Sequence, residues 1–425
     1  MNLGKKIDKL PSYITRILRA ASLVGDQRKI RVFLVGGGVR DMLLGKRNFD
    51  IDLAVEGEGI RFSQLLQQEL GGEIIKHSDF DTATLKLSDI KVDVSACRRE
   101  DYAFAGALPR VSPASLEEDL QRRDFTINAM AVSLNKDTWG ELIDLFGGRR
   151  DLRQKQLNVL HSKSFIDDPT RILRCLRLKV RLGFKYSSSL KKLLSQAKEK
   201  ELLRLVNVQR IRDELILMLK EQEPYLQMKE LNSLFGLKFI DEGINISNKD
   251  LRLILNAQKT ILRLKEKSLL KRELDEWIIY MMVVVCNLNK RNLASVLAKM
   301  RLRRGEEKRI VDSHRKEIVR QLKTKITSFR IYKLLKPLSF EVIVFFYVKE
   351  KNRILRRNII DFLAKYNNIT LNISGKDLLQ LGVKPSSVYG KILDALLKKK
   401  LKGKIHSLTE EREEARAILR RWHFY

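Results

Sequence analysis

The chain has 425 residues, of which 44% are hydrophobic, and its 84 lysines and arginines outnumber its 52 aspartates and glutamates to give a net charge of +32. This length allows two to four domains of about 150 residues each, and the charge favours binding to a polyanion, most commonly a nucleic acid. The longest apolar runs, residues 277–286 and 342–348, are too short to span a bilayer. Residues 1–6 lack the apolar core of a signal peptide, so we expect neither a membrane span nor a leader.

Cysteines and histidines are few and dispersed. Cys97, Cys175 and Cys286 form no C-x-x-C pair, and the five histidines do not cluster. This pattern supports neither a structural zinc site nor a cysteine nucleophile. It is typical of a cytoplasmic chain with reduced thiols, which is the location that we expect.

The first predicted elements surround a glycine-rich turn. Residues 31–35 are apolar and β-branched and predict a buried strand, and residues 39–44 predict the first turns of a helix. Gly36, Gly37 and Gly38 lie between them and would let the backbone approach a ligand closely. A strand, a glycine turn and a helix N-terminus form an anion site, because free N–H groups and the helix dipole face the turn.

A second strand, residues 49–55, follows with Asp50 and Asp52 separated by one apolar residue. Side chains alternate along a strand, so the two carboxylates share a face while Ile51 and Leu53 enter the core. An isolated Asp-x-Asp is most often a solvated strand face. Beside a phosphate-binding turn, however, two carboxylates are suited to hold Mg²⁺ against a triphosphate, and we favour this interpretation.

Asp93 is a further acidic residue in a predicted strand, where it stands between apolar neighbours. If this strand lies beside the one that carries Asp50 and Asp52, Asp93 is a third carboxylate of the metal site. Otherwise it is an aspartate on an edge strand. The downstream elements predicted in this part of the chain are a helix at residues 61–70 and strands at 82–87, 91–94 and 129–134.

Two arginines, Arg122 and Arg123, precede Asp124 and the apolar stretch that contains Asn128. Arginine suits triphosphate oxygens because its guanidinium donates two parallel hydrogen bonds. Taken alone, this segment is more typical of a cluster of surface salt bridges.

The helical part of the chain opens with Asp168, which suits the N-cap position, and Pro169, which suits the first helical position. Arg171, Arg174 and Arg177 then fall three residues apart, on one stripe of the predicted helix. Such a stripe beside a capping aspartate could read a base edge with its first residues and phosphates with the others. A structural and a nucleotide-binding interpretation are both open at this point.

After residue 168, glycine, proline and β-branched alternation become scarce, and Leu, Lys, Arg and Glu recur at helical spacing. The chain is therefore predicted to be α+β, with a mixed head followed by an all-α remainder. Basic clusters lie in this remainder at residues 301–304, 353–357 and 398–404. Each alone is typical of a solvated helix face, whereas together they favour a surface that follows a phosphate backbone.

These motifs together resemble the class II tRNA nucleotidyltransferases, the CCA-adding family that also includes bacterial poly(A) polymerases. The resemblance implies a polymerase β-like nucleotidyltransferase head with a small mixed sheet, followed by an all-α neck, body and tail. Four motifs occur in the family's order, and two weaker ones follow. The four lie at residues 34–52, 122–129, 144–152 and 168–171, and the weaker ones at 209–215 and 372–385.

The resemblance also implies domain boundaries. An N-terminal helical segment (1–27) precedes the catalytic head (28–160), and a helical neck (161–225) recognises the base. A helical body (226–365) and a tRNA-binding helical tail (366–425) follow. In the family, the acidic element before the neck helix reads Glu-Asp-x-x-Arg, and Asp167 stands here in place of its Glu.

The implied activity is addition of C and A from CTP and ATP to the 3′ end of tRNA, which is bound through its acceptor and T arms. Asp50 and Asp52 would hold two Mg²⁺ ions, with Asp93 as a further catalytic carboxylate, while the tRNA 3′-hydroxyl attacks the α-phosphate and pyrophosphate leaves. Asp168 and Arg171 would form an amino-acid template for the base. The other residues implied to hold the nucleotide are Gly36, Gly37, Arg40, Arg123, Asp124, Asn128, Arg174 and Arg177.

Other segments of the sequence distinguish among alternative functions. Residues 101–109 lie where the family has a loop that governs the change from C to A, and their sequence is close to that of enzymes that add only CC or only A. A poly(A) polymerase is less favoured, because residues 80–87 lack the basic and aromatic strand of those enzymes. A non-catalytic RNA-binding module is disfavoured by Asp50 and Asp52, since clustered negative charge gains nothing beside RNA. The sequence indicates no obligatory protein partner.

Overall fold

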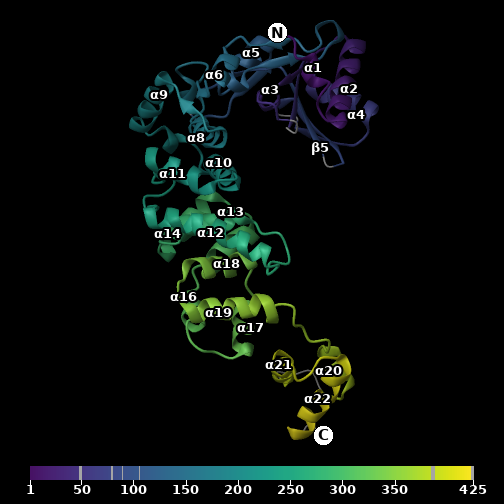
Figure 1. Cartoon of the computed structure of the whole chain (residues 1–425), viewed down its shortest axis with the longest axis vertical. Helices are drawn as coiled ribbons and strands as arrows, with labels where there is room; N and C mark the ends of the chain where they lie inside the picture. The colour runs from purple at the N-terminus through teal and green to yellow at the C-terminus, as the bar shows by residue number, and fades with distance from the viewer. Residues whose placement is uncertain (47–49, 78–79, 89, 105, 384–387, 423–425) are drawn as a thin grey trace. The chain divides into compact units, whose positions relative to one another are not determined.

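The structure is a computed structural model that describes residues 1–46, 50–77, 80–88, 90–104, 106–383 and 388–422. The chain divides into two compact units, Met1–Ile240 and Asp241–Tyr425. Strands and helices alternate in the first unit and helices make up the second (Figure 1). Some residues of the predicted motifs, namely Phe49, Ala105, Lys384 and Pro385, lie outside the described residues.

The first unit is built on a mixed sheet. Its described strands are seven, in the order β3-β4-β5-β2-β1-β8-β9, and all neighbours run antiparallel except β2 and β5, which are parallel. This agrees with the mixed sheet predicted for the head. The strands are β1 (Arg31–Val35), β2 (Ile51–Glu56), β3 (Glu73–His77), β4 (Thr82–Leu87), β5 (Ile90–Ala96), β8 (Ala131–Ser133) and β9 (Leu142–Ile143).

Helices and smaller sheets complete the first unit. Strands β6 (Arg98–Asp101) and β7 (Arg110–Pro113) form an antiparallel pair, and β10 (Gln156–Leu157) pairs in parallel with β11 (Lys185–Tyr186). Helix α8 packs against α10 and α11. The helices are α1 (Gly4–Ile7), α2 (Ser12–Arg28), α3 (Gly37–Leu43), α4 (Gly59–Leu70), α5 (Leu116–Gln121), η2 (Thr126–Asn128), η3 (Lys136–Thr138), α6 (Gly148–Arg153), α7 (Ser164–Asp167), α8 (Thr170–Leu182), α9 (Ser188–Glu199), η4 (Leu202–Leu205), α10 (Val208–Lys220) and α11 (Pro224–Leu234).

The large sheet has a different core on each face, because successive side chains of a strand point to opposite sides. Val32 and Leu34 of β1 join a buried cluster with α2 and α4. Phe33 and Val35 join a smaller cluster with α5 on the other face. Strand β2 follows the same alternation, so that Asp52 projects from the face that carries α5.

The second unit is helical in its described residues. Its two most apolar helices, α13 and α18, pack against each other in the interior. Among the described residues, no helix combines the length and the apolar character that a bilayer crossing requires. The helices are α12 (Asn248–Glu266), α13 (Glu276–Val285), α14 (Lys290–Met300), α15 (Arg304–Asp312), α16 (Lys316–Leu322), α17 (Ser328–Leu335), α18 (Phe340–Lys349), α19 (Arg353–Asp361), η5 (Phe362–Tyr366), α20 (Gly375–Gln380), α21 (Val388–Leu401) and α22 (Leu408–Arg421).

Predicted elements differ from the observed ones mainly at their ends. Strands β1 and β4 have the predicted bounds, and β2 begins one residue after Asp50. Helix α3 begins at Gly37 rather than Val39, so that Gly36 alone occupies the turn. Strand β8 is shorter than the predicted 129–134, because Ala129 caps the end of η2 and the strand begins only at Ala131. The division of the helical part into neck, body and tail stays a prediction.

Candidate active site

Asp52 and Asp93 lie side by side on neighbouring strands. Strands β2 and β5 are parallel with Asp52 in register with Asp93, so both side chains project from the same face of the sheet. Asp93 therefore lies beside Asp52 and not on an edge strand, and its role as a third carboxylate of a metal site stays a prediction. Its carboxylate accepts a hydrogen bond of 2.5 Å from Thr84 Oγ1 on β4. Asp50 is exposed and precedes β2.

Burial raises the pKa of the Asp52 carboxyl to about 6, and the charges of Asp93 and Asp50 add to this rise although Arg123 opposes it. The raised pKa of Asp52 thus reflects mainly the loss of hydration of its carboxyl group. In the described part of the chain, no three His, Cys, Asp or Glu side chains already surround one metal position. Mg²⁺, however, is commonly held by one or two carboxylates together with substrate phosphates and water, and these oxygens suit it.

The glycine turn brings the backbone close to both charges of the site. Gly36 has a φ of 68°, a conformation that favours glycine. A Cβ at Gly36 would lie 2.9 Å from Arg123 Nη1 and 3.8 Å from Asp52 Oδ2. A Cβ at Gly37 would meet Arg40 Nη2 at an ordinary 3.5 Å. Gly36 is thus favoured as glycine by its positive φ, with Arg123 Nη1 close by, whereas a Cβ at Gly37 has room.

Arg123 is held by a fully buried carboxylate. Asp119 of α5 accepts from Arg123 Nε and Nη2 at 3.2 and 2.9 Å, and from Arg122 Nε and Nη2 at 3.1 and 2.7 Å. Burial alone would raise the pKa of Asp119, but the two guanidiniums hold it below its usual value. Asp119 therefore stays charged at neutral pH and orients both arginines.

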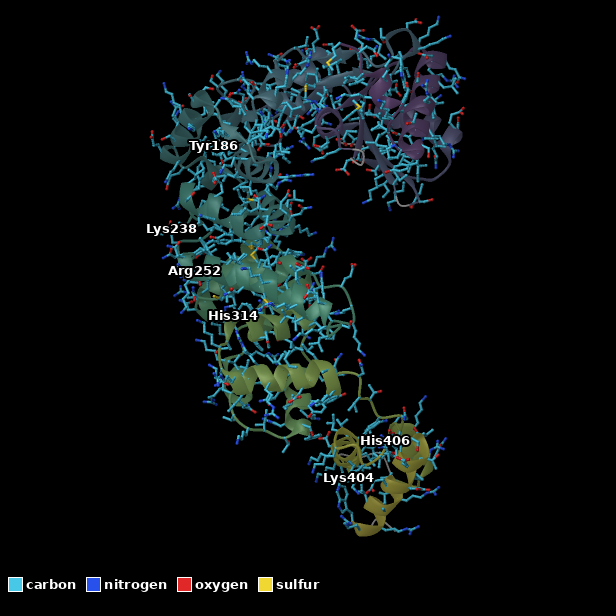
Figure 2. All side chains as sticks on the ribbon, in the orientation of Figure 1. Tyr186, Lys238, Arg252, His314, Lys404 and His406 are labelled. Atoms are coloured by element: carbon cyan, nitrogen blue, oxygen red, sulfur yellow. The ribbon has the colours of Figure 1, made fainter. Side chains whose placement is uncertain are left out.

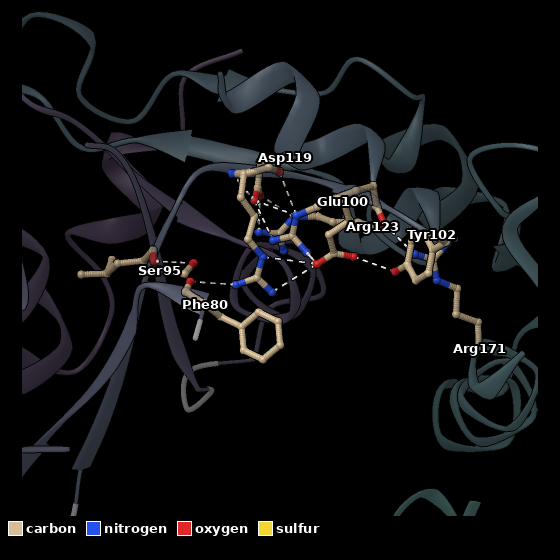
Figure 3. Close-up of polar contacts among 10 residues, drawn as sticks. Phe80, Ser95, Glu100, Tyr102, Asp119, Arg123 and Arg171 are labelled. Atoms are coloured by element: carbon tan, nitrogen blue, oxygen red, sulfur yellow. Dashed lines mark hydrogen bonds and ion pairs between the residues drawn. The ribbon is translucent and has the colours of Figure 1, made fainter. Parts of the chain in front are cut away.

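A second carboxylate, Glu100 of β6, extends this network (Figure 3). Glu100 accepts from Arg122 at 2.7 Å, from Arg98 at 3.2 Å and from the Tyr102 hydroxyl at 2.7 Å. Arg98 also lies over the Phe80 ring, 5.1 Å from its centre. The β6–β7 pair is thus tied by charge to the arginines that follow α5.

A chain of polar contacts links α3, which follows the glycine turn, to helix α8. Arg40 Nη1 donates to Asn128 Oδ1 at 2.7 Å, and Asn128 Nδ2 donates to Asp124 Oδ1 at 3.1 Å. The other oxygen of Asp124 lies 2.8 Å from Arg174 Nη2. Burial would raise the pKa of Asp124, but the charge of Arg174 and its hydrogen bonds hold it low.

The last arginine of the predicted stripe, Arg177, faces acidic residues at α10 and its C-terminal end. Arg177 forms ion pairs with Glu214 at 3.3 Å and with Glu221 at 3.4 Å. Arg174 also lies 4.0 Å from Glu214, whose pKa is raised because burial outweighs both arginines. A phosphate bound to these arginines would therefore compete with existing carboxylates.

Asp168 and Arg171 lie where α8 begins. Asp168 is extended, with a φ of −135°, and Pro169 has a helical φ of −65°, which agrees with the predicted capping and first helical positions although the assigned helix begins at Thr170. Asp168 accepts from the Thr170 N–H at 3.0 Å and therefore satisfies a free helix donor. Arg171 is buried and donates to Ser164 Oγ at 3.0 Å and to the Arg122 carbonyl at 2.7 Å.

These side chains converge on one cavity of about 480 Å³ within the first unit. Asp52 and Arg123 also line an adjacent cavity of about 380 Å³ that Asp93 borders. Gly36 and Asp50 are not among the lining residues of the larger cavity. Its lining includes the predicted residues Gly37, Arg40, Asp52, Arg123, Asp124, Asn128, Asp168, Arg171, Arg174 and Arg177.

Sequence reasoning missed several residues of this cavity. The cavity is also lined by Arg98, Glu100, Tyr102 and Arg210. The buried Asp119 does not line it but accepts hydrogen bonds from Arg122 and Arg123, which do. Tyr102 and Arg210 lie in the segments 101–109 and 209–215, which the sequence already singles out, whereas the four consecutive charged residues of β6 are more typical of a solvated strand. Their importance lies in contacts between residues far apart in the chain, which spacing does not reveal.

The basic clusters of the second unit are partly neutralised within the chain. Lys399 pairs with Glu414 at 2.5 Å, Lys400 pairs with the fully buried Glu411, and Lys398 lies over the Phe329 ring at 4.8 Å. Two further basic residues of this cluster, Lys402 and Lys404, are exposed, and Figure 2 labels Lys404 at the surface of this unit. In this cluster, residues 398–400 thus make contacts within the unit, whereas Lys402 and Lys404 are exposed to solvent.

Comparisons with known proteins place this chain among enzymes that act on tRNA ends. The model of the poly A polymerase head domain matches residues 32–158. The A-adding tRNA nucleotidyltransferase of Geobacter sulfurreducens is 33% identical over 95% of this chain, which spans only 47% of that protein. The A-adding tRNA nucleotidyltransferase of Halalkalibacterium halodurans is 30% identical over 94% of this chain and 92% of its own length.

Solved structures show the same likeness in three dimensions. A CCA-adding enzyme without ligand has a TM-score of 0.79 at 30% identity, with 99% of each chain covered. The Thermotoga maritima CCA-adding enzyme in complex with tRNA has a TM-score of 0.74 at 30% identity and the same coverage. A CCA-adding enzyme in complex with ATP has a TM-score of 0.75 at 29% identity, over 100% of this chain and 97% of the other. The chain therefore belongs to the family of tRNA nucleotidyltransferases and poly(A) polymerases.

Proposed function

We propose that this protein transfers a nucleotide from ATP to the 3′ end of tRNA, with release of pyrophosphate. The observation that carries the proposal is the in-register pair Asp52 and Asp93 beside a cavity lined by arginines. Carboxylates alone would repel a triphosphate, and arginines alone would only bind it. A site with both suits a metal-dependent phosphoryl transfer.

Asp50 and Asp52 would hold Mg²⁺, with Asp93 beside them, and the raised pKa of Asp52 fits a carboxyl group that lacks a compensating cation. The metal would supply positive charge for the phosphates and lower the pKa of the attacking hydroxyl. Two ions are the number that the family resemblance implies. The residues present suit such ions in their chemistry, because each offers carboxylate oxygen.

The chain's own side chains would bind and orient the nucleotide. Arg123, set by Asp119, faces Gly36 and is suited to bind phosphate oxygens through its fork. Arg40 and Asn128 lie on the same side of the cavity. The hydrogen bond from Arg40 to Asn128 orients both side chains before the nucleotide binds, so that little side-chain entropy is lost on binding.

Base selection would lie at the start of α8. Asp168 and Arg171 line the cavity together, and a carboxylate beside a guanidinium offers an acceptor and donors to a base edge. A site built to pair with one pattern of donors and acceptors rejects bases that leave its polar groups unpaired.

Addition of A alone is favoured over addition of the whole CCA end by the relatives that span most of this chain, since these are named A-adding. The sequence of residues 101–109 also favours partial over complete addition, because it is close to that of enzymes that add only CC or only A. Addition of CCA is the second candidate, because the solved structures that cover 99% of this chain are of CCA-adding enzymes. A cytoplasmic location, as expected for tRNA maturation, stays a prediction.

An extension assay on three tRNA transcripts separates these candidates. The transcripts end at the discriminator base, after one C and after CC, and each is incubated with protein, Mg²⁺ and ATP or CTP or both. We expect ATP to extend only the transcript that ends in CC, and CTP to extend none. Addition of C to the shorter transcripts together with A to the one that ends in CC would establish the CCA-adding alternative, addition of C alone would indicate a CC-adding enzyme, and binding without any extension would contradict the proposal.

A further inference from the structure

Arg210 joins three segments of the first unit at Asp168. Arg210 lies near the start of α10 and donates from Nη2 to Asp168 Oδ1 at 2.8 Å. Its Nη1 donates to the Gly106 carbonyl at 3.1 Å. The same guanidinium lines the cavity that Asp168 and Arg171 line. One side chain therefore connects α10, the residues before α8 and the segment that follows β6.

The two oxygens of Asp168 differ in their environment. Oδ1 accepts from the Thr170 N–H at 3.0 Å, from the Thr170 hydroxyl at 2.7 Å and from Arg210. Oδ2 accepts no hydrogen bond from any residue in the described ranges, and the side chain is 13% exposed. The protein thus orients the carboxylate through one oxygen and leaves the other to accept from a ligand in the cavity.

A carboxylate oxygen fixed in this way distinguishes two classes of base. Adenine and cytosine carry an amino group, a hydrogen-bond donor, where guanine and uracil carry a carbonyl oxygen. An ionised carboxylate only accepts hydrogen bonds, so Oδ2 pairs with the amino group and repels the carbonyl. The discrimination depends on the orientation of the carboxylate, because a freely rotating carboxylate can turn away from a mismatched base.

We propose that Arg210 is a positioning residue that fixes this orientation and thereby sets the preference for amino-bearing over carbonyl-bearing bases. The inference rests on the proposed nucleotidyl transfer and adds a residue that acts through Asp168. The second hydrogen bond of Arg210 anchors the guanidinium on the Gly106 carbonyl. Gly106 itself is closely packed, since a Cβ there would lie 3.0 Å from the Leu205 carbonyl oxygen.

Arginine and lysine should differ at this position. The fork of Arg210 reaches Asp168 and Gly106 with separate nitrogens, whereas the single ammonium of a lysine keeps the charge without the fork. Arg210→Lys thus tests the geometry while the charge is held constant. Arg212→Ala is a matched control, because Arg212 lies two residues along the same helix, pairs with Asp213 at 2.7 Å and does not line the cavity.

The experiment measures kcat/KM for ATP, CTP, GTP and UTP on tRNA that ends in CC, together with the melting temperature of each variant. We expect Arg210→Ala to lower the discrimination of the preferred nucleotide against GTP and UTP by about tenfold or more, because hydrogen-bonding sites owe their selectivity to fixed partners. Arg210→Lys should give an intermediate ratio, and Arg212→Ala should keep the wild-type ratio.

A double variant tests whether the effect passes through Asp168. If it does, Asp168→Ala with Arg210→Ala should discriminate no worse than Asp168→Ala alone, because residues that act together are not additive. An unchanged ratio in Arg210→Ala, or an equal loss in Arg212→Ala, would overturn the inference. If Arg210→Ala fails to fold, a wild-type ratio in Arg210→Lys has the same consequence. A wild-type protein that adds no nucleotide refutes the proposed function itself, and the inference with it.

Discussion

Asp119 shows how a single buried residue can set the geometry of a site that it does not enter. Its two oxygens take four hydrogen bonds from Arg122 and Arg123, and the side chain is fully buried. Breaking a buried charge pair by removal of one partner costs about 3–5 kcal/mol, because the other charge is left uncompensated. Asp119 should therefore matter for stability and for phosphate binding alike.

Asp119→Asn should lower the melting temperature at neutral pH, and the difference should shrink in acid. The guanidiniums of Arg122 and Arg123 hold the folded-state pKa of Asp119 below its ordinary value, so its charge stabilises the folded state at any pH above that ordinary value. This contribution is lost as the pH falls further and the wild-type carboxylate takes up a proton. Thermal unfolding of both proteins between pH 3 and 7 measures the effect.

Glu117→Gln on the exposed side of α5 is the control for this series, and we expect it to follow the wild-type curve. A constant difference between Asp119→Asn and wild type across the pH range would contradict the assigned role. Nucleotide addition by Asp119→Asn should also fall, since Arg123 loses the carboxylate that orients it.

What the sequence could predict at the residue scale follows from local periodicity. The orientation of Asp52 away from Ile51 and Leu53 was open to prediction because side chains alternate along a strand with a period of two, whereas the position of Asp93 beside Asp52 was left open. That position depends on the pairing of β2 with β5. Arg210 lies in the predicted segment 209–215, but its contact with Asp168, like that of Glu100 with Arg122, could not be predicted because the partners lie 42 and 22 residues away along the chain.

At the scale of elements, the junction between β1 and α3 has one position that favours glycine. A Cβ at Gly36 would meet Arg123 at 2.9 Å, and the residue has a positive φ. Gly36→Ala should therefore destabilise the protein by about 1–3 kcal/mol and displace Arg123. Chemical denaturation and the KM for ATP measure the two effects.

Gly37→Ala is the matched control, because its Cβ would make only an ordinary contact and the residue lies inside α3. Alanine in a helix is more favourable than glycine, so the stability should be unchanged or slightly higher. Equal losses of stability in both variants would mean that a methyl group at either position destabilises the protein, and that the positive φ of Gly36 does not explain its loss.

Prediction of elements succeeded where the pattern was apolar and failed where charge was buried. Strands β1 and β4 have the predicted bounds because their alternation or apolar run is clear. The β6–β7 pair was not predicted, since its segments are rich in Arg, Glu and Asp, which are usually solvated. Here the charges compensate one another inside the cavity wall, and only the tertiary structure reveals that.

At the scale of the whole molecule, the charge of +32 overstates the positive surface available to RNA. In the cluster at residues 398–404, Lys399 and Lys400 already pair with Glu414 and Glu411. Replacement of these lysines should weaken the packing between α21 and α22. Lys402 and Lys404 are exposed and are better candidates for contacts with phosphates.

Two double variants test this division of the cluster. Lys402→Gln with Lys404→Gln should weaken tRNA binding at low salt and reduce the slope of log affinity against log salt by up to about two units, since each phosphate contact releases counterions. Lys399→Gln with Lys400→Gln should lower the melting temperature more than it changes the slope. If the first pair leaves both affinity and slope unchanged, tRNA must be bound by other residues.

The central claim, that Asp52 serves nucleotide transfer to tRNA, is tested most directly by extension of a tRNA that ends in CC with ATP and Mg²⁺, for wild type and for Asp52→Asn. Loss of a carboxylate that holds the metal should remove most of the electrostatic stabilisation of the transition state. We predict that wild type adds one A and that Asp52→Asn is slower by about a hundredfold or more, with tRNA affinity nearly unchanged. Extension by Asp52→Asn at close to the wild-type rate would contradict the account.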